Sequence, residues 1–274
     1  MAQEDFLAKQ YFQDGDYGKA VVFYEKLVET NPRRTDYAEG LVACYQQLER
    51  YDDAEAFLLQ KIEDSYAFPT FYIELGYNFT LKNEAEKANA YYDKAINKIE
   101  DNPNYGYSVG YRFQKYALLD YAIQAYTNAM ELKPDLNYDF QLARIYGELG
   151  DIAKMYQSYL NLIWEGRTSR SNVLRNIDDF ISEDPSNENN MLLRKVLLQN
   201  AQKAPDILWN ELLSWLFVQQ KQYSSSFSQE KAIFKRSEGQ SVDRLENLGS
   251  IALEDKDWET ATEIYEYIVD NTEN

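Results

Sequence analysis

The chain has 274 residues, a mass of 32.1 kDa and a formal net charge of −18, from 46 acidic and 28 basic side chains. It contains no histidine, which excludes catalysis that depends on a histidine base and removes the commonest protein ligand for metals. The acidic balance argues against binding to nucleic acid or to an anionic membrane surface, because both need clustered basic side chains.

The first 136 residues repeat with a period of 34 residues. Alanine recurs at the same place in each repeat, an aromatic residue precedes it by nine positions, and a large apolar residue follows it by four. The alanines are Ala20, Ala54, Ala88 and Ala122. A 34-residue period is typical of stacked helical hairpins, in which each hairpin buries its apolar face against its neighbours. We therefore expect hairpins at 1–34, 35–68, 69–102 and 103–136.

The pattern continues less regularly toward the C-terminus. Residues 137–168 predict a fifth hairpin, in which Met155 takes the alanine position. Residues 169–206 keep the spacing of two helices but lose the small residues, so we expect a divergent hairpin there. Two further hairpins are predicted over 207–274. The predicted organisation is thus five regular units over 1–168, a divergent hairpin over 169–206 and two more units, in one continuous solenoid.

Two stretches carry a family pattern most clearly. Residues 69–102 contain Tyr72, Leu75, Gly76, Phe79, Ala88, Tyr92 and Ala95, and residues 103–136 contain Val109, Gly110, Phe113, Ala122, Tyr126, Ala129 and Pro134. This pattern resembles the tetratricopeptide repeat (TPR) family. The resemblance implies an all-α, right-handed superhelical solenoid of helix–turn–helix hairpins. It also implies a non-catalytic scaffold that binds a protein or peptide with its concave face.

The family resemblance places the binding surface on the first helix of each hairpin. The second, fifth, ninth and twelfth residues of each unit would line it. In this sequence the candidate partner-binding residues include Asp36, Glu39, Tyr77, Tyr107, Tyr111, Gln114, Phe140 and Arg144. Exposed tyrosines in such a groove favour binding, because they offer a large contact area with few rotatable bonds. An alternative stays open, in which Tyr107 and Tyr111 only cover the backbone of Gly106 and Gly110.

No motif in the sequence indicates a cofactor, a metal site or catalysis. There is no glycine-rich phosphate loop and no paired-cysteine motif. One basic cluster, Arg167, Arg170 and Arg175, could hold a phosphate or a carboxylate, or could be a solvated loop and helix start. No stretch approaches the ~18 apolar residues expected of a membrane span, so no direct membrane insertion is predicted.

A second function is compatible with the last hairpin. Residues 241–274 end on an amphipathic helix with no polar capping helix after it. This predicts, as the alternative, a structural subunit of a multiprotein or homo-oligomeric assembly that docks through its C-terminal end. At the other end, Ala2 and Gln3 resemble the start of a mature exported bacterial protein. A periplasmic or exported location and a cytoplasmic one are equally compatible with the sequence.

Overall fold

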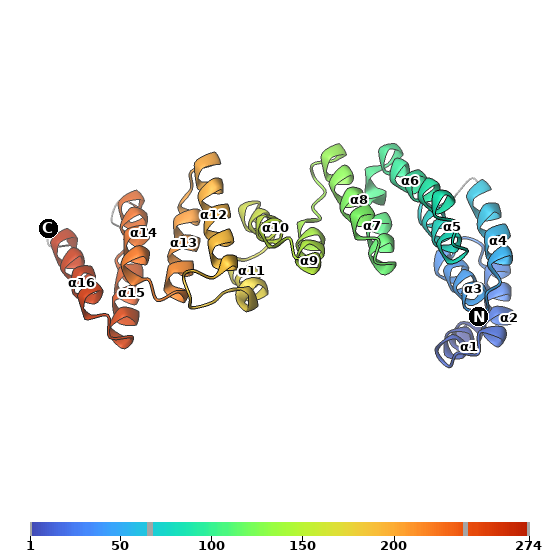
Figure 1. The fold of residues 1–274 in the computed structure, drawn as a ribbon, viewed down its shortest axis with the longest axis horizontal. Coiled ribbons are helices and arrows are strands. Elements are labelled where there is room, and N and C mark those ends of the chain that lie inside the picture. Colours follow the sequence, from blue (N-terminus) through green and yellow to red (C-terminus); the bar gives the residue numbers. More distant parts are fainter. Residues whose placement is uncertain (1, 65–67, 238–240, 273–274) are drawn as a thin grey trace. The chain divides into compact units, whose positions relative to one another are not determined.

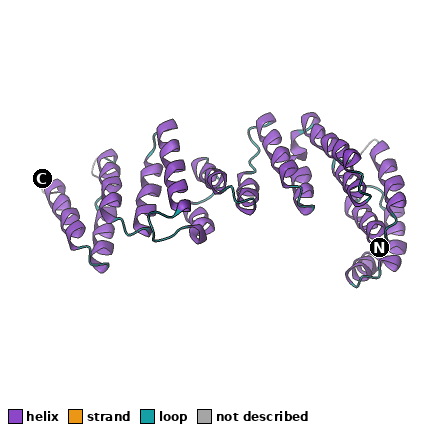
Figure 2. Ribbon diagram, in the orientation of Figure 1, coloured by secondary structure: helices purple, strands orange, loops and turns teal. Residues whose placement is uncertain are grey.

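The computed structural model describes residues 2–64, 68–237 and 241–272. Within these ranges it contains sixteen α-helices, two short 3-10 helices and no strand (Figure 2). The predicted all-α fold of helical hairpins is confirmed. The export interpretation rests partly on Met1, which lies outside the described residues, as do residues 273–274 at the end of the last predicted hairpin.

Contacts between helices group the chain into two compact units, an N-terminal unit of residues 1–138 and a C-terminal unit of residues 139–274. The single continuous solenoid and its right-handed superhelix stay predictions.

The N-terminal unit consists of four hairpins, each made of two antiparallel neighbours in the sequence (Figure 1). A 3-10 helix, η1 (Pro103–Tyr105), precedes the fourth. The hairpins are α1 (Ala2–Gln13) with α2 (Tyr17–Thr30), α3 (Thr35–Gln47) with α4 (Tyr51–Glu63), α5 (Thr70–Leu81) with α6 (Ala85–Asp101), and α7 (Gly106–Lys115) with α8 (Leu119–Leu132).

The C-terminal unit has eight α-helices over its described residues, and one pair departs from the hairpin rule. Its helices are α9 (Asp139–Glu148), α10 (Ile152–Trp164), α11 (Arg170–Ile177), α12 (Glu188–Lys203), α13 (Ile207–Gln219), α14 (Tyr223–Arg236), α15 (Asp243–Glu254) and α16 (Trp258–Thr272), with η2 (Asp178–Phe180) after α11. Helix α12 packs against α10 and α13, while α11 packs against α10. Helix α11 therefore lies beside the α9–α10 hairpin rather than forming a close pair with α12.

A left-handed residue closes most of the hairpin turns. Positive φ angles recur at Gly15, Glu49, Asn83 and Ala117, again 34 residues apart. The next N–H in each turn donates to the carbonyl of the residue five positions earlier, as Asp16 does to Tyr11 at 2.8 Å. This is the Schellman arrangement, which satisfies helix-end carbonyls. The period seen in the sequence is thus the period of a turn as well as of a core.

In the core of the N-terminal unit, small residues on one helix leave room for large side chains of the neighbouring helix. The four periodic alanines are buried. A Cβ placed on Gly76 or Gly110 would lie 2.4 Å from Tyr92 Cε1 or 2.5 Å from Tyr126 Cε1. Both glycines are therefore required for the tyrosine rings to pack on bare helix backbone.

Candidate functional site

The first helices α3, α5 and α7 of the N-terminal unit pack side by side and share a buried charged cluster. Arg112 of α7 donates through Nη1 to Glu74 Oε1 of α5 at 2.6 Å, and its Nη2 contacts Glu39 Oε1 of α3. The Tyr116 hydroxyl donates to the second oxygen of Glu74 at 2.6 Å. Glu74 is 2% exposed and Arg112 is 9% exposed. One cation therefore links three successive hairpins.

Burial and pairing oppose each other within this cluster. Desolvation raises the pKa of Glu74, although Arg112 and the Tyr116 hydroxyl partly offset it. Burial lowers the pKa of Arg112, but the hydrogen bond to Glu39 and the charge of Glu74 outweigh that, so the pKa is raised. Burial, and then the Glu74 charge, raise the pKa of Tyr116. Arg112 and Tyr116 therefore stay protonated. Of the groups in the cluster, the Glu74 carboxylate is the one whose charged form burial disfavours most.

Aromatic rings cover and extend this cluster. Tyr77 stacks on Tyr116 with centroids 3.9 Å apart and an angle of 16° between the planes. On α7, Tyr107 and Tyr111 lie parallel, with centroids 6.0 Å and planes 7° apart, and are 50% and 57% exposed. The pair forms a flat apolar surface open to solvent.

Helix α7 packs closely at two of its glycines. A Cβ on Gly106 would meet Ala129 of α8 and Tyr138, and one on Gly110 would meet Tyr126 of α8. The half exposure of Tyr107 and Tyr111 favours the binding interpretation, and the covering interpretation stays the alternative.

Several other predicted residues are engaged within the chain. Asp36 is exposed but accepts two hydrogen bonds from Arg34, at 2.7 and 2.6 Å. Gln114 accepts from the Tyr126 hydroxyl at 2.7 Å. A partner would have to displace these contacts, as it would the ion pair of Glu39.

The remaining two predicted residues, Phe140 and Arg144, lie in the C-terminal unit on α9. They are four residues apart and so share a helix face. Phe140 is partly exposed and meets Tyr159 of α10 edge to face, with centroids 6.3 Å apart. Burial raises the pKa of Tyr159, while the nearby charge of Arg144 opposes the shift. The eight predicted residues thus divide between two units, six and two.

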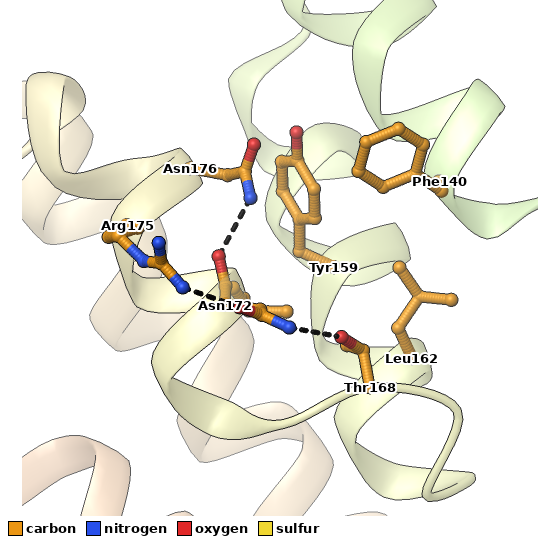
Figure 3. Close-up of a pocket in the computed structure, with 8 residues that line it drawn as sticks. Phe140, Tyr159, Leu162, Thr168, Asn172, Arg175 and Asn176 are labelled. Carbon is orange, nitrogen blue, oxygen red and sulfur yellow. Dashed lines mark hydrogen bonds between the residues drawn. The ribbon is translucent and has the colours of Figure 1, made fainter.

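A pocket of about 370 Å³ opens beside Phe140 (Figure 3). Helix α10 and the following loop contribute Tyr159, Leu162 and Thr168, and α11 contributes Asn172, Val173, Arg175 and Asn176. Arg175 Nη2 donates to Asn172 Oδ1 at 2.6 Å, and Asn176 Nδ2 donates to the Asn172 carbonyl at 2.7 Å. One wall is therefore aromatic and aliphatic, and the facing wall is made of amides and a guanidinium group.

The three arginines of the basic cluster have different surroundings. Arg167 pairs with Glu165 at 3.4 Å, and Arg170 pairs with Glu211 of α13 at 2.7 Å. Among the residues that the structure describes, no carboxylate forms an ion pair with Arg175. Only Arg175 of the three lines the pocket with Phe140.

A second charged cluster lies across α11, α13, α14 and α15. Arg244 donates to both oxygens of Glu230 at 2.7 Å and to Glu211 Oε1 at 3.3 Å, and Glu211 also accepts from Arg170. Ser214 hydrogen-bonds to Glu230. These residues line an open pocket of about 330 Å³ together with the apolar side chains of Trp215 and Leu248. Its two cations and two carboxylates pair with each other.

Sequence reasoning missed Glu74, Arg112 and the α11 amides. A signal for the first two was present, since Glu74 stands between Ile73 and Leu75, and Arg112 directly precedes Phe113. A charge at such a place needs a partner. No comparable signal marked Asn172 or Asn176, because the position of α11 beside α10 depends on packing.

Two other kinds of site are absent from the described ranges. No helix there is long and apolar enough to cross a membrane. No group of three or more potential metal-binding side chains comes together among the same residues.

Comparisons with known proteins identify the repeat. Residues 11–63 match the family model described as tetratricopeptide repeat. The chain matches no curated protein sequence. Solved structures that it resembles include the C-terminal part of a TPR repeat-containing protein from Cytophaga hutchinsonii, with 17% identity, 86% of this chain and 98% of that chain covered, and a TM-score of 0.34. PilF of Pseudomonas aeruginosa gives 16% identity over 77% of this chain and 95% of that chain, with a TM-score of 0.36.

Proposed function

We propose that this chain, whose residues 11–63 match the tetratricopeptide repeat, is a non-catalytic scaffold that binds a protein or peptide on the face formed by its first helices. Stacked helical hairpins are typical of interaction scaffolds, because the row of first helices offers an extended surface to a partner. Within that face, we choose the contact residues by the exposure of each side chain and by whether other residues of the chain already hold it. A residue already held within the chain is a poor anchor, whereas an exposed aromatic residue is a good one.

The stacked pair Tyr107 and Tyr111 is the observation that carries this proposal. Two parallel rings, half exposed, lie on α7, the helix that also carries Arg112 of the buried Glu39–Arg112–Glu74 cluster. Their positions are fixed by packing beneath them, since Gly106 and Gly110 lock α7 onto α8. A rigid aromatic surface binds with a small loss of conformational entropy. We therefore assign the partner's main apolar contact in the N-terminal unit to these two rings.

A capture experiment with matched variants tests the assignment. Immobilised wild-type chain and the Tyr107→Ala/Tyr111→Ala variant would be compared for the proteins they retain from an extract of the source cells. The control is Val22→Ala/Leu132→Ala, because Val22 and Leu132 are comparably exposed apolar residues on the second helices α2 and α8. We expect partners retained by wild type and by the control to bind the tyrosine variant at least about tenfold more weakly. Equal retention by all three would contradict the assignment.

A second candidate function is supported by one feature of the C-terminal unit. A hollow of about 590 Å³ lies along α15 and α16, lined by Leu253, Tyr265 and Val269, of which Leu253 and Val269 are partly exposed. Apolar surface of this kind suits a subunit contact. Light scattering at several concentrations separates this structural role from the first proposal, because assembly raises the mass above 32.1 kDa. Replacement of Val269 by Asp should then restore the monomer mass.

A further inference from the structure

The pocket between α9, α10 and α11 has features beyond those of a general peptide surface. We propose that it binds the side-chain carboxylate of a glutamate or aspartate within a partner peptide, with an adjacent apolar side chain resting on Phe140. This inference rests on the proposed function, since it names the chemistry that the C-terminal unit recognises.

The polar wall of the pocket is arranged as a set of donors. Arg175, Asn172 and Asn176 lie on successive turns of α11, and hydrogen bonds among them hold their side chains in place. Asn172 is also held at the helix start, where its side chain donates to Thr168 Oγ1 at 3.3 Å. Arg175 uses Nη2 for Asn172, which leaves its other guanidinium N–H groups for a ligand. A planar guanidinium group matches a carboxylate in shape as well as charge.

The electrostatics of this pocket differ from those of the second pocket. None of the residues lining it is acidic, and Arg175 is its one charged lining residue. Arg144, on the same α9 face as Phe140, acts on Tyr159 with a second positive charge. The second pocket contains equal numbers of cations and carboxylates that already pair. Of these two pockets, only the one in Figure 3 offers an incoming carboxylate a cation that forms no ion pair among the described residues.

The net charge of −18 repels acidic ligands at long range. At physiological ionic strength that repulsion is screened beyond about 8 Å, whereas a contact with Arg175 is not. Recognition must therefore occur at contact distance. Such a site selects a carboxylate that other contacts have already brought to the surface.

The apolar wall explains why the ligand should be amphipathic. Phe140, Tyr159 and Leu162 lie on the side of the pocket opposite α11 (Figure 3), and Val173 adds a further apolar lining residue. The volume, about 370 Å³, falls at the small end of the range of about 300–1,000 Å³ for small-ligand sites. This is room for one or two side chains. A single lining cation suits a carboxylate better than a phosphate group, whose charge is about −1.5 to −2.

The polar wall of the pocket also differs from the predicted groove, although Phe140 belongs to both. Asn172, Arg175 and Asn176 are the fourth, seventh and eighth residues of 169–206. The groove positions expected from the repeat are the second, fifth, ninth and twelfth. The pocket therefore arises from the placement of α11 beside α10, which the regular hairpins do not share.

Titration with blocked dipeptides tests the proposal on the whole chain. The probes are acetyl-Glu-Phe-amide, acetyl-Gln-Phe-amide and acetyl-phosphoserine-Phe-amide, so that no terminal carboxylate is present. Binding would be followed by NMR through the side-chain amide signals of Asn172 and Asn176. We expect the Glu peptide to shift these signals with a dissociation constant on the order of millimolar, about tenfold tighter than the Gln peptide. The phosphoserine peptide should bind no tighter than the Glu peptide.

Two variants locate the effect. Arg175→Gln should abolish the preference for Glu over Gln, whereas Arg236→Gln, which removes an exposed arginine of α14 away from the pocket, should keep it. Both replaced side chains are exposed, and circular dichroism would check that each variant folds.

The outcomes separate this inference from the general function. Equal binding of the Glu and Gln peptides at the pocket would overturn carboxylate recognition and leave peptide binding intact. Tighter binding of the phosphoserine peptide would overturn the choice of carboxylate. No shift with any probe would overturn the pocket itself, while the tyrosine capture experiment would still decide the proposed function.

Discussion

The two compact units both join their first helices with charged side chains, but the two clusters differ in access to water. In the N-terminal unit Arg112 is buried between Glu39 and Glu74, and Tyr116 closes over the second carboxylate. In the C-terminal unit Arg244 has a side chain that is 39% exposed and lines an open pocket. A buried charge that loses its partner is strongly destabilising, whereas an exposed one returns to water. The same kind of contact is therefore closed to water in one unit and partly open to it in the other.

Removing the arginine from each cluster should give the largest contrast. Arg112→Met leaves Glu74 buried without its cation and should cost about 3–5 kcal/mol of unfolding free energy. Arg244→Met should cost less, about 1–3 kcal/mol, because solvent screens the 39% exposed Arg244 side chain and the buried Glu230 keeps its hydrogen bond from Ser214. Urea unfolding measures both, and the four tryptophans all lie in the C-terminal unit. Tryptophan fluorescence thus reports that unit alone, and circular dichroism reports both. Equal losses would contradict the distinction.

The fit of helix on helix should also differ between the units. Gly110→Ala drives a Cβ to 2.5 Å from the Tyr126 ring and should cost about 1–3 kcal/mol. Gly147→Ala places its Cβ 3.1 Å from Met155 Sδ, and the flexible thioether can move aside. We expect a loss below about 1 kcal/mol there. The matched control is Gly18→Ala, where nothing lies within 4 Å and the alanine should slightly favour the helix.

The pH dependence of the buried cluster should be smaller than these effects and specific to the N-terminal unit. Because the folded pKa of Glu74 lies above its ordinary value of 4.5, its protonated form favours the folded state. That contribution is complete below pH 4.5 and is lost as the pH rises through the folded pKa. Glu74→Gln should therefore match wild type near pH 4 and become relatively more stable toward pH 7. A constant difference between the two chains across this range, measured by circular dichroism, would show that Glu74 is not the titrating group.

The smallest effects should come from the hairpin turns. Ala117 adopts a φ of 54°, which glycine tolerates better, so Ala117→Gly should stabilise the N-terminal unit by about 0.5–1 kcal/mol. Lys221 has a φ of 55° in the equivalent turn of α13 and α14, but it also pairs with Glu183 at 3.2 Å. Lys221→Gly should gain less, because it loses that ion pair. Thermal unfolding of the two variants gives the comparison.

Features that depend on residues close together in the sequence could be predicted from it, and features that depend on residues far apart in the sequence could not. The periodic alanines and the aromatic and apolar residues spaced around them act locally, so they predicted the helical hairpins well. The left-handed turns at Glu49 and Ala117 carry no glycine, and only the period of the repeat indicates them. The ion pairs of Arg112 join residues 38 and 73 positions apart, and no local pattern specifies such a pairing.

The candidate site was predictable in part for the same reason. Tyr107 and Tyr111 stand out on a helix with two glycines, and the exposure of both follows from where those glycines face. Phe140 was recognised as a groove residue, but its pocket was not. That pocket requires α11 to pack against α10 while α12 packs against α10 and α13, an outcome of tertiary packing in a stretch without the repeat pattern.

Site-specific photocrosslinking tests the central claim, that a partner polypeptide contacts the first-helix face. A photoreactive phenylalanine analogue would replace Tyr111 on α7 in one chain and Leu132 on α8 in another, since both positions are about equally exposed. The claim predicts adducts with a partner from position 111 and few or none from position 132. Adducts from position 132 with none from position 111 would contradict it.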